Sequence, residues 1–161
     1  GREAGTQLGA SVSMKERNKI AELVDAAKAG GAKVHLGGTT PEGAGAFYPA
    51  TVLEVAKDDA ILAEEVFGPV APVVLFDTDE EALKMANDTE YGLISYVYSE
   101  DLKRAIRFAE GIEAGMVGIN RGLLSDPAAP FGGVKQSGLG REGGFDGVHE
   151  FLQTKYIGVE I

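Results

Sequence analysis

Apolar positions repeat with a helical period in three stretches of the chain. The first follows a capping-box pair, Ser13 and Glu16, and ends at Gly30-Gly31. The second follows the pair Thr78 and Glu81 and ends around residues 87–90, and the third has Ser99 as its expected N-cap. The apolar faces are Ile20, Leu23, Val24 and Ala27 in the first stretch, and Leu102, Ala105, Ile106, Ala109 and Ile112 in the third. The pattern predicts amphipathic helices in all three stretches.

Short apolar or β-branched segments between the helices predict strands. These segments are residues 33–36, 47–55, 70–76, 95–98, 116–120 and 155–161, and residues 147–154 predict one more short helix. Residues 116–120 are apolar at nearly every position, as strands covered on both faces are. The alternation of helices and strands predicts an α/β fold with a largely parallel sheet and flanking helices.

Residues 64–70 form a corner between a helical pattern at residues 60–65 and the predicted strand that begins at Val70. Pro69 disfavours helical geometry at Gly68, so the helix is expected to stop near Glu65. The corner therefore carries Glu65 and Phe67, and such a turn can aim side chains into a cleft. Composition alone favours a simpler interpretation, in which the acids are solvated and the Phe belongs to the core.

Glycine replaces periodicity between residues 121 and 144, and a loop of this length in a compact domain is usually functional. Gly138, Gly140 and Gly143 match the Gly-x-Gly-x-x-Gly dinucleotide fingerprint. That fingerprint needs a strand immediately before it and a helix that opens on it, whereas loop residues precede it here. The three glycines therefore predict an irregular turn and no dinucleotide site.

Length and charge restrict the possible classes of function. The 161 residues have the length of one domain, and 44% hydrophobic with 25% charged residues are typical of a soluble globular protein. The net charge of −10 argues against nucleic-acid and anionic-membrane partners, which would be repelled. The sequence contains neither a membrane-spanning apolar run nor a secretory signal, so we expect a cytoplasmic protein.

Few residues outside the corner suggest chemistry by themselves. The chain has no cysteine, and its two histidines, His35 and His149, lack the nearby ligands of a metal site. Arg121 and Ser125 could together hold a carboxylate by charge-assisted hydrogen bonds, or could be a solvated Arg and an ordinary turn Ser. Glu142 could act as a functional acid or could pair with its neighbour Arg141.

Several motifs taken together resemble the aldehyde dehydrogenase superfamily in order and spacing. They are residues 64–69 (EEVFGP), 87–93 (NDTEYGL), 115–120 (GMVGIN) and 130–143 (PFGGVKQSGLGREG). Within the superfamily, residues 118–125 (GINRGLLS) and 129–135 (APFGGVK) look most like succinate-semialdehyde dehydrogenases. The resemblance implies that residues 1–154 are part of a catalytic domain, downstream of its nucleophile. It also implies that residues 155–161 are a terminal strand used for oligomerisation.

The chemistry implied by the resemblance is the NAD- or NADP-dependent oxidation of an aldehyde to an acid, here succinate semialdehyde to succinate. That chemistry needs a cysteine thiolate nucleophile, oxyanion donors, a hydride-accepting nicotinamide and a carboxylate-activated water. Neither the nucleophile nor the general-base Glu has a counterpart in this chain, which has no cysteine at all. We therefore expect the chain alone to be inactive, with no catalytic residue except Glu142, which matches a glutamate proposed as a proton relay.

The resemblance also assigns the binding residues. Glu65 matches the glutamate that hydrogen-bonds the nicotinamide ribose, and Phe67 matches the aromatic beside the nicotinamide ring. Asn120 opens the loop that forms a wall of the substrate tunnel, and Phe131 corresponds to an aromatic of that tunnel. Ser125 matches the serine that helps bind the distal carboxylate of the substrate.

Arg121 departs from the family pattern, because relatives often have Thr or Glu at this position. It could add positive charge near the tail of the substrate or simply face solvent.

Two alternative functions remain open. One is a dehydrogenase for another aldehyde, of glutarate type or neutral, and the other is a truncated, non-catalytic assembly module that pairs through its last strand. In the full-length enzyme we expect a homo-oligomer that acts on a small-molecule semialdehyde.

Overall fold

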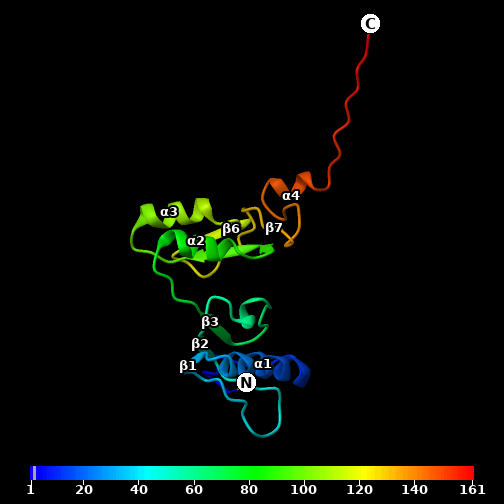
Figure 1. Cartoon of the computed structure of the whole chain (residues 1–161). Coiled ribbons are helices and arrows are strands. Elements are labelled where there is room, and N and C mark those ends of the chain that lie inside the picture. Colours follow the sequence, from blue (N-terminus) through cyan, green and yellow to red (C-terminus); the bar gives the residue numbers. More distant parts are fainter. Residues whose placement is uncertain (2) are drawn as a thin grey trace. The chain divides into compact units, whose positions relative to one another are not determined.

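The computed structural model describes residues 1 and 3–161 and has an α/β fold (Figure 1). The chain divides into two compact units, residues 1–76 and residues 77–161. The first unit has one three-stranded sheet and the second has two two-stranded sheets, and each unit has its own helices. None of the helices in the described part of the chain is both long and apolar enough to cross a membrane.

The first unit packs one long helix against a three-stranded sheet. Its elements are α1 (Met14–Ala29), β1 (Lys33–Leu36), β2 (Thr51–Glu54), the 3₁₀ helix η1 (Ala60–Leu62) and β3 (Val70–Val73). The sheet order is β1-β2-β3; β1 and β2 are antiparallel, whereas β2 and β3 are parallel. The core contains the apolar face of α1 that the sequence predicts. The buried residues of the core are Ile20, Val24 and Ala27 of α1, together with Tyr48, Leu53, Val55 and Ile61.

The second unit contains two pairs of strands and three helices. Its elements are α2 (Asp79–Asn87), β4 (Tyr91–Gly92), β5 (Ile94–Val97), α3 (Leu102–Gly111), β6 (Met116–Ile119), β7 (Val134–Lys135) and α4 (Asp146–His149). Strands β5 and β6 are parallel, and β4 and β7 are antiparallel. The α/β class is thus confirmed, with parallel pairs at β2–β3 and β5–β6 and an antiparallel pair in each unit.

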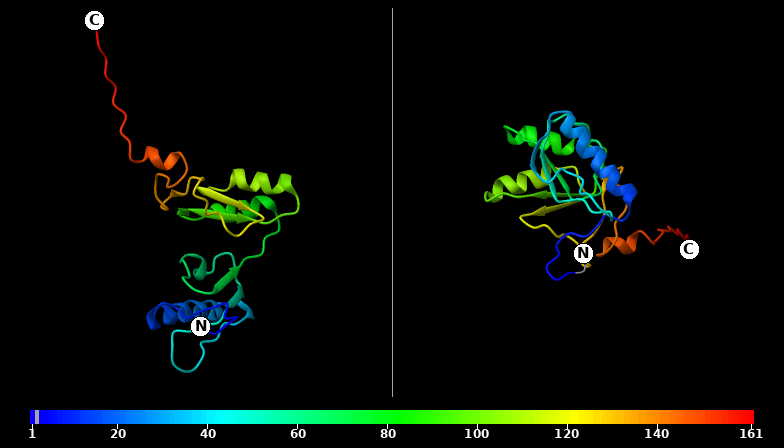
Figure 2. Two further views of the ribbon diagram at one scale, coloured as in Figure 1. Left: turned by 180° about the vertical axis from the view of Figure 1, so that it is seen from behind. Right: turned by 90° about the horizontal axis from the view of Figure 1, so that it is seen from below.

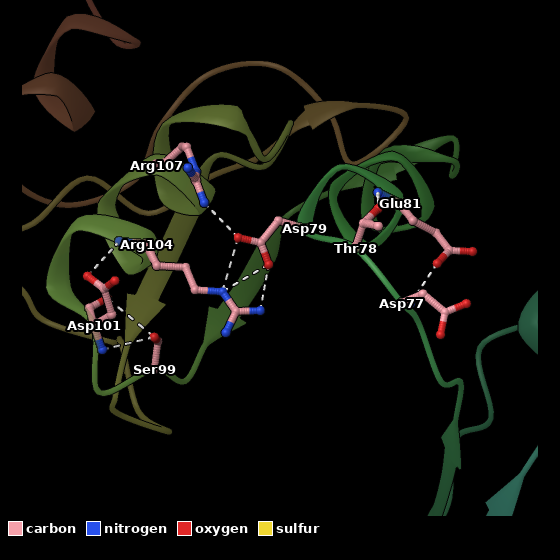
Figure 3. A network of polar contacts seen from close by, with 8 residues as sticks. All are labelled: Asp77, Thr78, Asp79, Glu81, Ser99, Asp101, Arg104 and Arg107. Atoms are coloured by element: carbon pink, nitrogen blue, oxygen red, sulfur yellow. Dashed lines mark hydrogen bonds and ion pairs between the residues drawn. The ribbon is translucent and has the colours of Figure 1, made fainter.

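Polar contacts join the elements of the second unit where apolar burial is sparse. Ala105 is its only buried hydrophobic residue among those described. The Asp79 carboxylate, at the start of α2, accepts hydrogen bonds from Arg104 and Arg107 of α3, at 2.5–3.1 Å (Figure 3). At the other end of α2, the Asn87 amide donates to Gly111 O and accepts from Glu113 N–H.

The predicted helix starts and strands are largely confirmed, with several differences in detail. Both capping boxes are present, since Ser13 Oγ accepts from Glu16 N–H and Thr78 Oγ1 accepts from Glu81 N–H. The N-cap of α3 is Asp101 and not Ser99, because the Asp101 carboxylate accepts from two amides of the first turn. Ser99 instead accepts a hydrogen bond from Asp101 N–H.

Other differences concern where elements end. The predicted strand at residues 47–55 is limited to β2, and the helix expected to reach Glu65 is the three-residue η1. The strand predicted at residues 70–76 ends at Val73. Beyond α4 the chain continues without helix or strand, visible in red in Figures 1 and 2. Residues 155–161 therefore pair with no strand in the described part of the chain, and their role in oligomerisation stays a prediction.

Candidate functional site

The corner at residues 64–70 is held against α1 on one side and against the sheet on the other. Two tight turns shape it, because Gly68 N–H donates to Val66 O and Val70 N–H donates to Gly68 O. Pro69 O accepts from Thr51 N–H, which joins the corner to β2. A Cβ on Gly68 would overlap Ile20 Cδ1, so a residue other than glycine would require Ile20 or the corner to shift.

An ion pair adds a second contact between the corner and α1. Lys19 Nζ lies 3.0 Å from Glu64 Oε2, and both side chains are more than half exposed. The hydrogen bond to Glu64 and the charge of its carboxylate raise the pKa of Lys19 above its ordinary value. Surface pairs of this kind contribute little stability on their own, so the pair mainly restrains Glu64.

Glu65 and Phe67, the two residues predicted to face a cofactor, point out of the packed part of the corner. Glu65 is exposed, and Phe67 is 77% exposed although Val66 between them packs against the core. The corner thus offers a carboxylate and an aromatic face that the first unit itself does not cover. This arrangement suits a ligand with hydroxyl donors beside a flat ring.

The predicted substrate residues lie together in the second unit, on the segment from Asn120 to Glu142. Arg121 and Ser125 are both exposed and four positions apart on the loop that follows β6. The Arg121 Nε–H donates to Leu123 O at 2.7 Å, which curls the start of the loop. Gly118 of β6 leaves room for the loop, because a Cβ there would lie 3.1 Å from Arg121 O.

Phe131 and Glu142 are brought side by side by their backbones. Phe131 N–H donates to Glu142 O and Glu142 N–H donates to Phe131 O, each at 2.7 Å, as an isolated antiparallel bridge. Between these two residues, Arg141 donates to the carbonyl oxygens of Gly133 and Gly140, both at 2.7 Å. Arg141 therefore holds the loop, and the Glu142 side chain is left for another role.

The glycine fingerprint is an irregular turn, as the sequence predicts. Gly138, Gly140 and Gly143 have φ angles of 99°, 84° and 69°, in the left-handed region that favours glycine. The helix that follows, α4, has only four residues. The strand before it, β7, has only two residues and is antiparallel to β4, so this segment is not the parallel βαβ unit of a dinucleotide-binding fold.

Sequence reasoning missed two parts of this region. Tyr98, Ser99, Glu100 and Asn120 line an open hollow at the ends of β5 and β6. Lys135 connects the far end of the loop to α2, since its Nζ donates to Asn87 O at 2.9 Å and to Thr89 O at 3.1 Å. A signal for the hollow was present in the sequence, because Ser99 follows one predicted strand and Asn120 ends another, and parallel strands end at the same edge. Nothing local to Lys135 pointed to its partners.

Comparisons with known proteins match this chain almost from end to end. The family described as "Aldehyde dehydrogenase family" matches residues 1–157. A succinate-semialdehyde dehydrogenase of Paenarthrobacter nicotinovorans is 51% identical over 160 residues, which are 99% of this chain and 36% of that protein. A glutarate-semialdehyde dehydrogenase of Pseudomonas putida is 45% identical over 161 residues, which are 100% of this chain and 33% of that protein.

Solved structures agree with the sequence comparisons. The crystal structure of succinate-semialdehyde dehydrogenase from Burkholderia pseudomallei has a TM-score of 0.87 and 45% identity, and the match covers 94% of this chain and 32% of that one. An NAD⁺ complex of an aldehyde dehydrogenase from Bacillus cereus has a TM-score of 0.83 and 40% identity, with 91% and 30% covered. The chain thus spans about a third of the length of the relatives it matches.

Proposed function

Because the chain belongs to the aldehyde dehydrogenase family, we propose that it forms part of an NAD(P)-dependent dehydrogenase that oxidises an acidic semialdehyde, succinate semialdehyde to succinate. The observation that carries this proposal is the match to semialdehyde dehydrogenases over essentially the whole chain, at 51% identity for the enzyme of Paenarthrobacter nicotinovorans. The chain covers about a third of that enzyme, so the activity is proposed for a protein that also supplies the remaining parts.

The corner at residues 64–70 supports the cofactor part of the proposal. Glu65 and Phe67 are exposed on a segment fixed by Gly68 and Pro69, which fits a nicotinamide riboside. The Glu65 carboxylate can accept hydrogen bonds from two neighbouring hydroxyls, and Phe67 can cover one face of a ring. When bound, nicotinamide would accept the hydride that leaves the substrate.

The loop after β6 supports the substrate part. Arg121 keeps several guanidinium N–H donors beyond the one bound to Leu123 O, and Ser125 offers a hydroxyl close by in the sequence. In a chain of net charge −10, a local cation is what an acidic substrate requires. Phe131 is proposed to line the path of the substrate, Asn120 to open the loop that forms a wall of that path, and Glu142 to relay a proton.

Glutarate semialdehyde is the second candidate substrate. The Pseudomonas putida relative, which is named for this activity, is 45% identical over the whole length of the present chain. Both substrates carry a distal carboxylate, and they differ by one methylene, which a pocket distinguishes by only about 10- to 200-fold. Arg121 and Ser125 would serve either one. The choice of NAD or NADP, a cytoplasmic location and assembly through residues 155–161 stay predictions.

The proposal is tested by placing the chain in a complete enzyme framework. The 161 residues replace the matching third of the Paenarthrobacter nicotinovorans enzyme, and kcat/KM is measured for succinate semialdehyde, glutarate semialdehyde and butanal. Arg121→Ala and Ser125→Ala are each expected to lower kcat/KM for the acidic substrates by about 10- to 100-fold, the usual effect of losing a hydrogen bond to a charged group. For butanal, which has no distal carboxylate, kcat/KM should change by less than about threefold.

Lys103→Ala is the matched control, because Lys103 is an exposed cation on α3 outside the loop. It should leave all three substrates unchanged. Equal losses for butanal and for the acidic semialdehydes would remove the carboxylate-binding role. A graft that reduces neither NAD nor NADP with any of the three aldehydes would contradict the proposed function itself.

A further inference from the structure

Two residues with an unusual backbone conformation bracket the loop that carries the candidate substrate residues. Among the residues described, Asn120 (φ 52°) and Lys135 (φ 55°) are the only non-glycines with positive φ. Residues 121–134 lie between them and include Arg121, Ser125 and Phe131. A side chain in the left-handed region is strained, and such conformations persist only where the surroundings hold them. Each of the two residues is therefore expected to be held in place by neighbouring groups.

Asn120 is held by a complete side-chain clip to the neighbouring strand end. Its Oδ1 accepts from Ser99 N–H at 2.9 Å, and its Nδ2 donates to Ser99 O at 2.8 Å. Its own N–H donates to Val97 O at 2.8 Å. The side-chain amide thus adds two hydrogen bonds beyond Val97 and Ile119, the last backbone pair of β5 and β6. The left-handed φ of Asn120 then turns the chain away from the sheet.

Lys135 is held by three groups at the far side of the loop. Its ammonium donates to the carbonyl oxygens of Asn87, the last residue of α2, and of Thr89, and it forms an ion pair with Glu113 at 2.6 Å. A cation at the C-terminal end of a helix also interacts favourably with the helix dipole. The Lys135 backbone pairs with Tyr91 in β4. Backbone and side chain therefore attach this end of the loop to two different elements.

The stretch between the two clips has most of its contacts in its second half. Ala129 N–H donates to Asp126 O, Pro127 O accepts from Gly144 N–H, Phe131 and Glu142 exchange two backbone hydrogen bonds, and Arg141 donates to Gly133 O. Leu123 is 71% exposed, and Arg121 and Ser125 are exposed as well. The first half of the loop therefore has little burial, and its order depends mainly on the points at which the loop is fixed.

We propose that Asn120 and Lys135 are positioning residues, whose side-chain clips hold residues 121–134 in the form that presents Arg121 and Ser125 to the acidic end of the substrate. The proposal rests on the proposed function for its substrate part, whereas the ordering of the loop depends on the structure alone. Asn120 thereby acts through the loop and not as a direct contact to substrate.

The clips are tested first on the 161-residue chain by amide hydrogen exchange. Asn120→Gly keeps a residue that adopts positive φ freely and removes only the amide clip, and Lys135→Met keeps the length of the side chain and removes the ammonium. Ser99 N–H reports on the Asn120 clip itself, and Ala129 and Phe131 N–H report on the loop. Each variant is expected to speed exchange at Ala129 and Phe131 by about tenfold, and Asn120→Gly also at Ser99.

Conservative and distant variants complete this experiment. Lys135→Arg keeps a cation and should retain most of the protection, whereas Asn120→Asp keeps the acceptor for Ser99 N–H but loses the donor to Ser99 O, and should therefore protect Ser99 N–H better than Asn120→Gly does. Asn18→Ala and Lys103→Met, at exposed helical positions, should leave the loop amides unchanged. Unchanged exchange at Ala129 and Phe131 in both clip variants would overturn the proposal, even with Ser99 exchanging faster.

The substrate part is measured in the grafted enzyme described above. Loss of either clip is expected to raise KM for succinate semialdehyde about tenfold while kcat stays within about threefold and butanal is unaffected. Equal falls of kcat for both aldehydes would indicate general damage and would overturn the positioning role. If the unaltered graft oxidises no semialdehyde, the proposed function fails, and the exchange experiment still decides whether the clips order the loop.

Discussion

The absence of a side chain at Gly68 sets how closely the corner at residues 64–70 approaches α1. An added Cβ would lie 2.4 Å from Ile20 Cδ1 and 2.8 Å from Ile20 Cγ1, and Ile20 is only 2% exposed. A buried side chain in a packed core has little freedom to move aside. The corner would therefore have to shift, and with it Glu65 and Phe67.

Gly68→Ala is expected to destabilise the chain by about 1–3 kcal/mol through overpacking. Ile20→Val removes the Cδ1 atom that the new methyl group meets first, and by itself should cost about 0.5–1.5 kcal/mol. The double variant should then be more stable than the sum of the two changes predicts, by about 1 kcal/mol. Urea unfolding of all four proteins measures this coupling.

Gly9→Ala is the matched control for this cycle, because a Cβ at Gly9 would meet nothing within 4 Å. It should leave the free energy of unfolding nearly unchanged. Additive effects of Gly68→Ala and Ile20→Val would show that the contact with Ile20 does not determine the position of the corner.

At the level of single residues, motif resemblance names candidate site residues but does not name the contacts that hold them. Glu65, Phe67, Ser125 and Phe131 were found from motif resemblance, and their exposure in the structure suits the roles proposed for them. The attachment of Lys135 to Asn87 and Thr89 was not predictable, because it joins positions more than forty residues apart. The left-handed φ of Asn120 was also hidden, since it depends on the hydrogen bonds to Ser99.

At the level of elements, one carboxylate joins the starts of two helices. Asp79 in the first turn of α2 binds Arg104 and Arg107 of α3, and its side chain is only 22% exposed (Figure 3). The hydrogen bond from Arg104 lowers the pKa of Asp79 below its ordinary value of 3.8, and the charges of both arginines act in the same direction. Ionised Asp79 is therefore favoured in the folded chain.

This lowered pKa predicts how stability changes in acid. A carboxyl group whose pKa is lower in the folded state stabilises the fold above its unfolded pKa, and this contribution is lost as the pH falls through the folded pKa. Thermal unfolding between about pH 6 and pH 2.5 should thus show a smaller fall in Tm below about pH 4 for Asp79→Asn than for the unaltered chain. At pH 7 the variant should have the lower Tm.

Glu110→Gln removes an exposed carboxylate at the other end of α3 and serves as the control. Its Tm profile should follow that of the unaltered chain. Parallel profiles for Asp79→Asn and the unaltered chain would show that the link between α2 and α3 has no stabilising effect.

Helix starts were predictable from the sequence and helix ends less so. Capping boxes act over three residues, and both predicted boxes formed. The helix expected to reach Glu65 is only η1, which ends at Leu62. The N-cap of α3 is Asp101, because its carboxylate accepts hydrogen bonds from two amides, whereas Ser99 offers one hydroxyl. Such choices between neighbouring polar residues are decided by geometry that the pattern does not contain.

At the level of the whole molecule, the two units are stabilised by different means. The first unit contains the cluster of buried apolar residues around α1 and β2, whereas the second relies on polar links and on close backbone contacts of its glycines. The helical repeat of apolar residues predicts α1 from the sequence. The division of the chain after residue 76 was not predicted, because no linker-like composition marks it. Exposed aromatic residues, among them Phe145 and Phe151, remain on the second unit.

The isolated 161-residue chain is expected to be catalytically inactive. The proposed reaction needs a thiolate nucleophile, and the sequence has no cysteine. Purified chain mixed with succinate semialdehyde and either NAD or NADP should give no increase in absorbance at the reduced-cofactor band beyond a blank without protein. The graft provides the positive control, and cofactor reduction by the chain alone would falsify this expectation.

Residues 121–134 leave the framework at Asn120 and rejoin it at Lys135, each through a clip made to backbone atoms or to a residue outside the loop. The fixed ends make this stretch an exchangeable cassette. A segment of different sequence is expected to fit at residues 121–131 while the strands β5, β6 and β7 keep their register. Gly132 and Gly133 must be kept, because a Cβ at either would meet neighbouring atoms, and Val134 belongs to β7. Libraries confined to residues 121–131 would thus explore new aldehyde specificities without redesign of the scaffold.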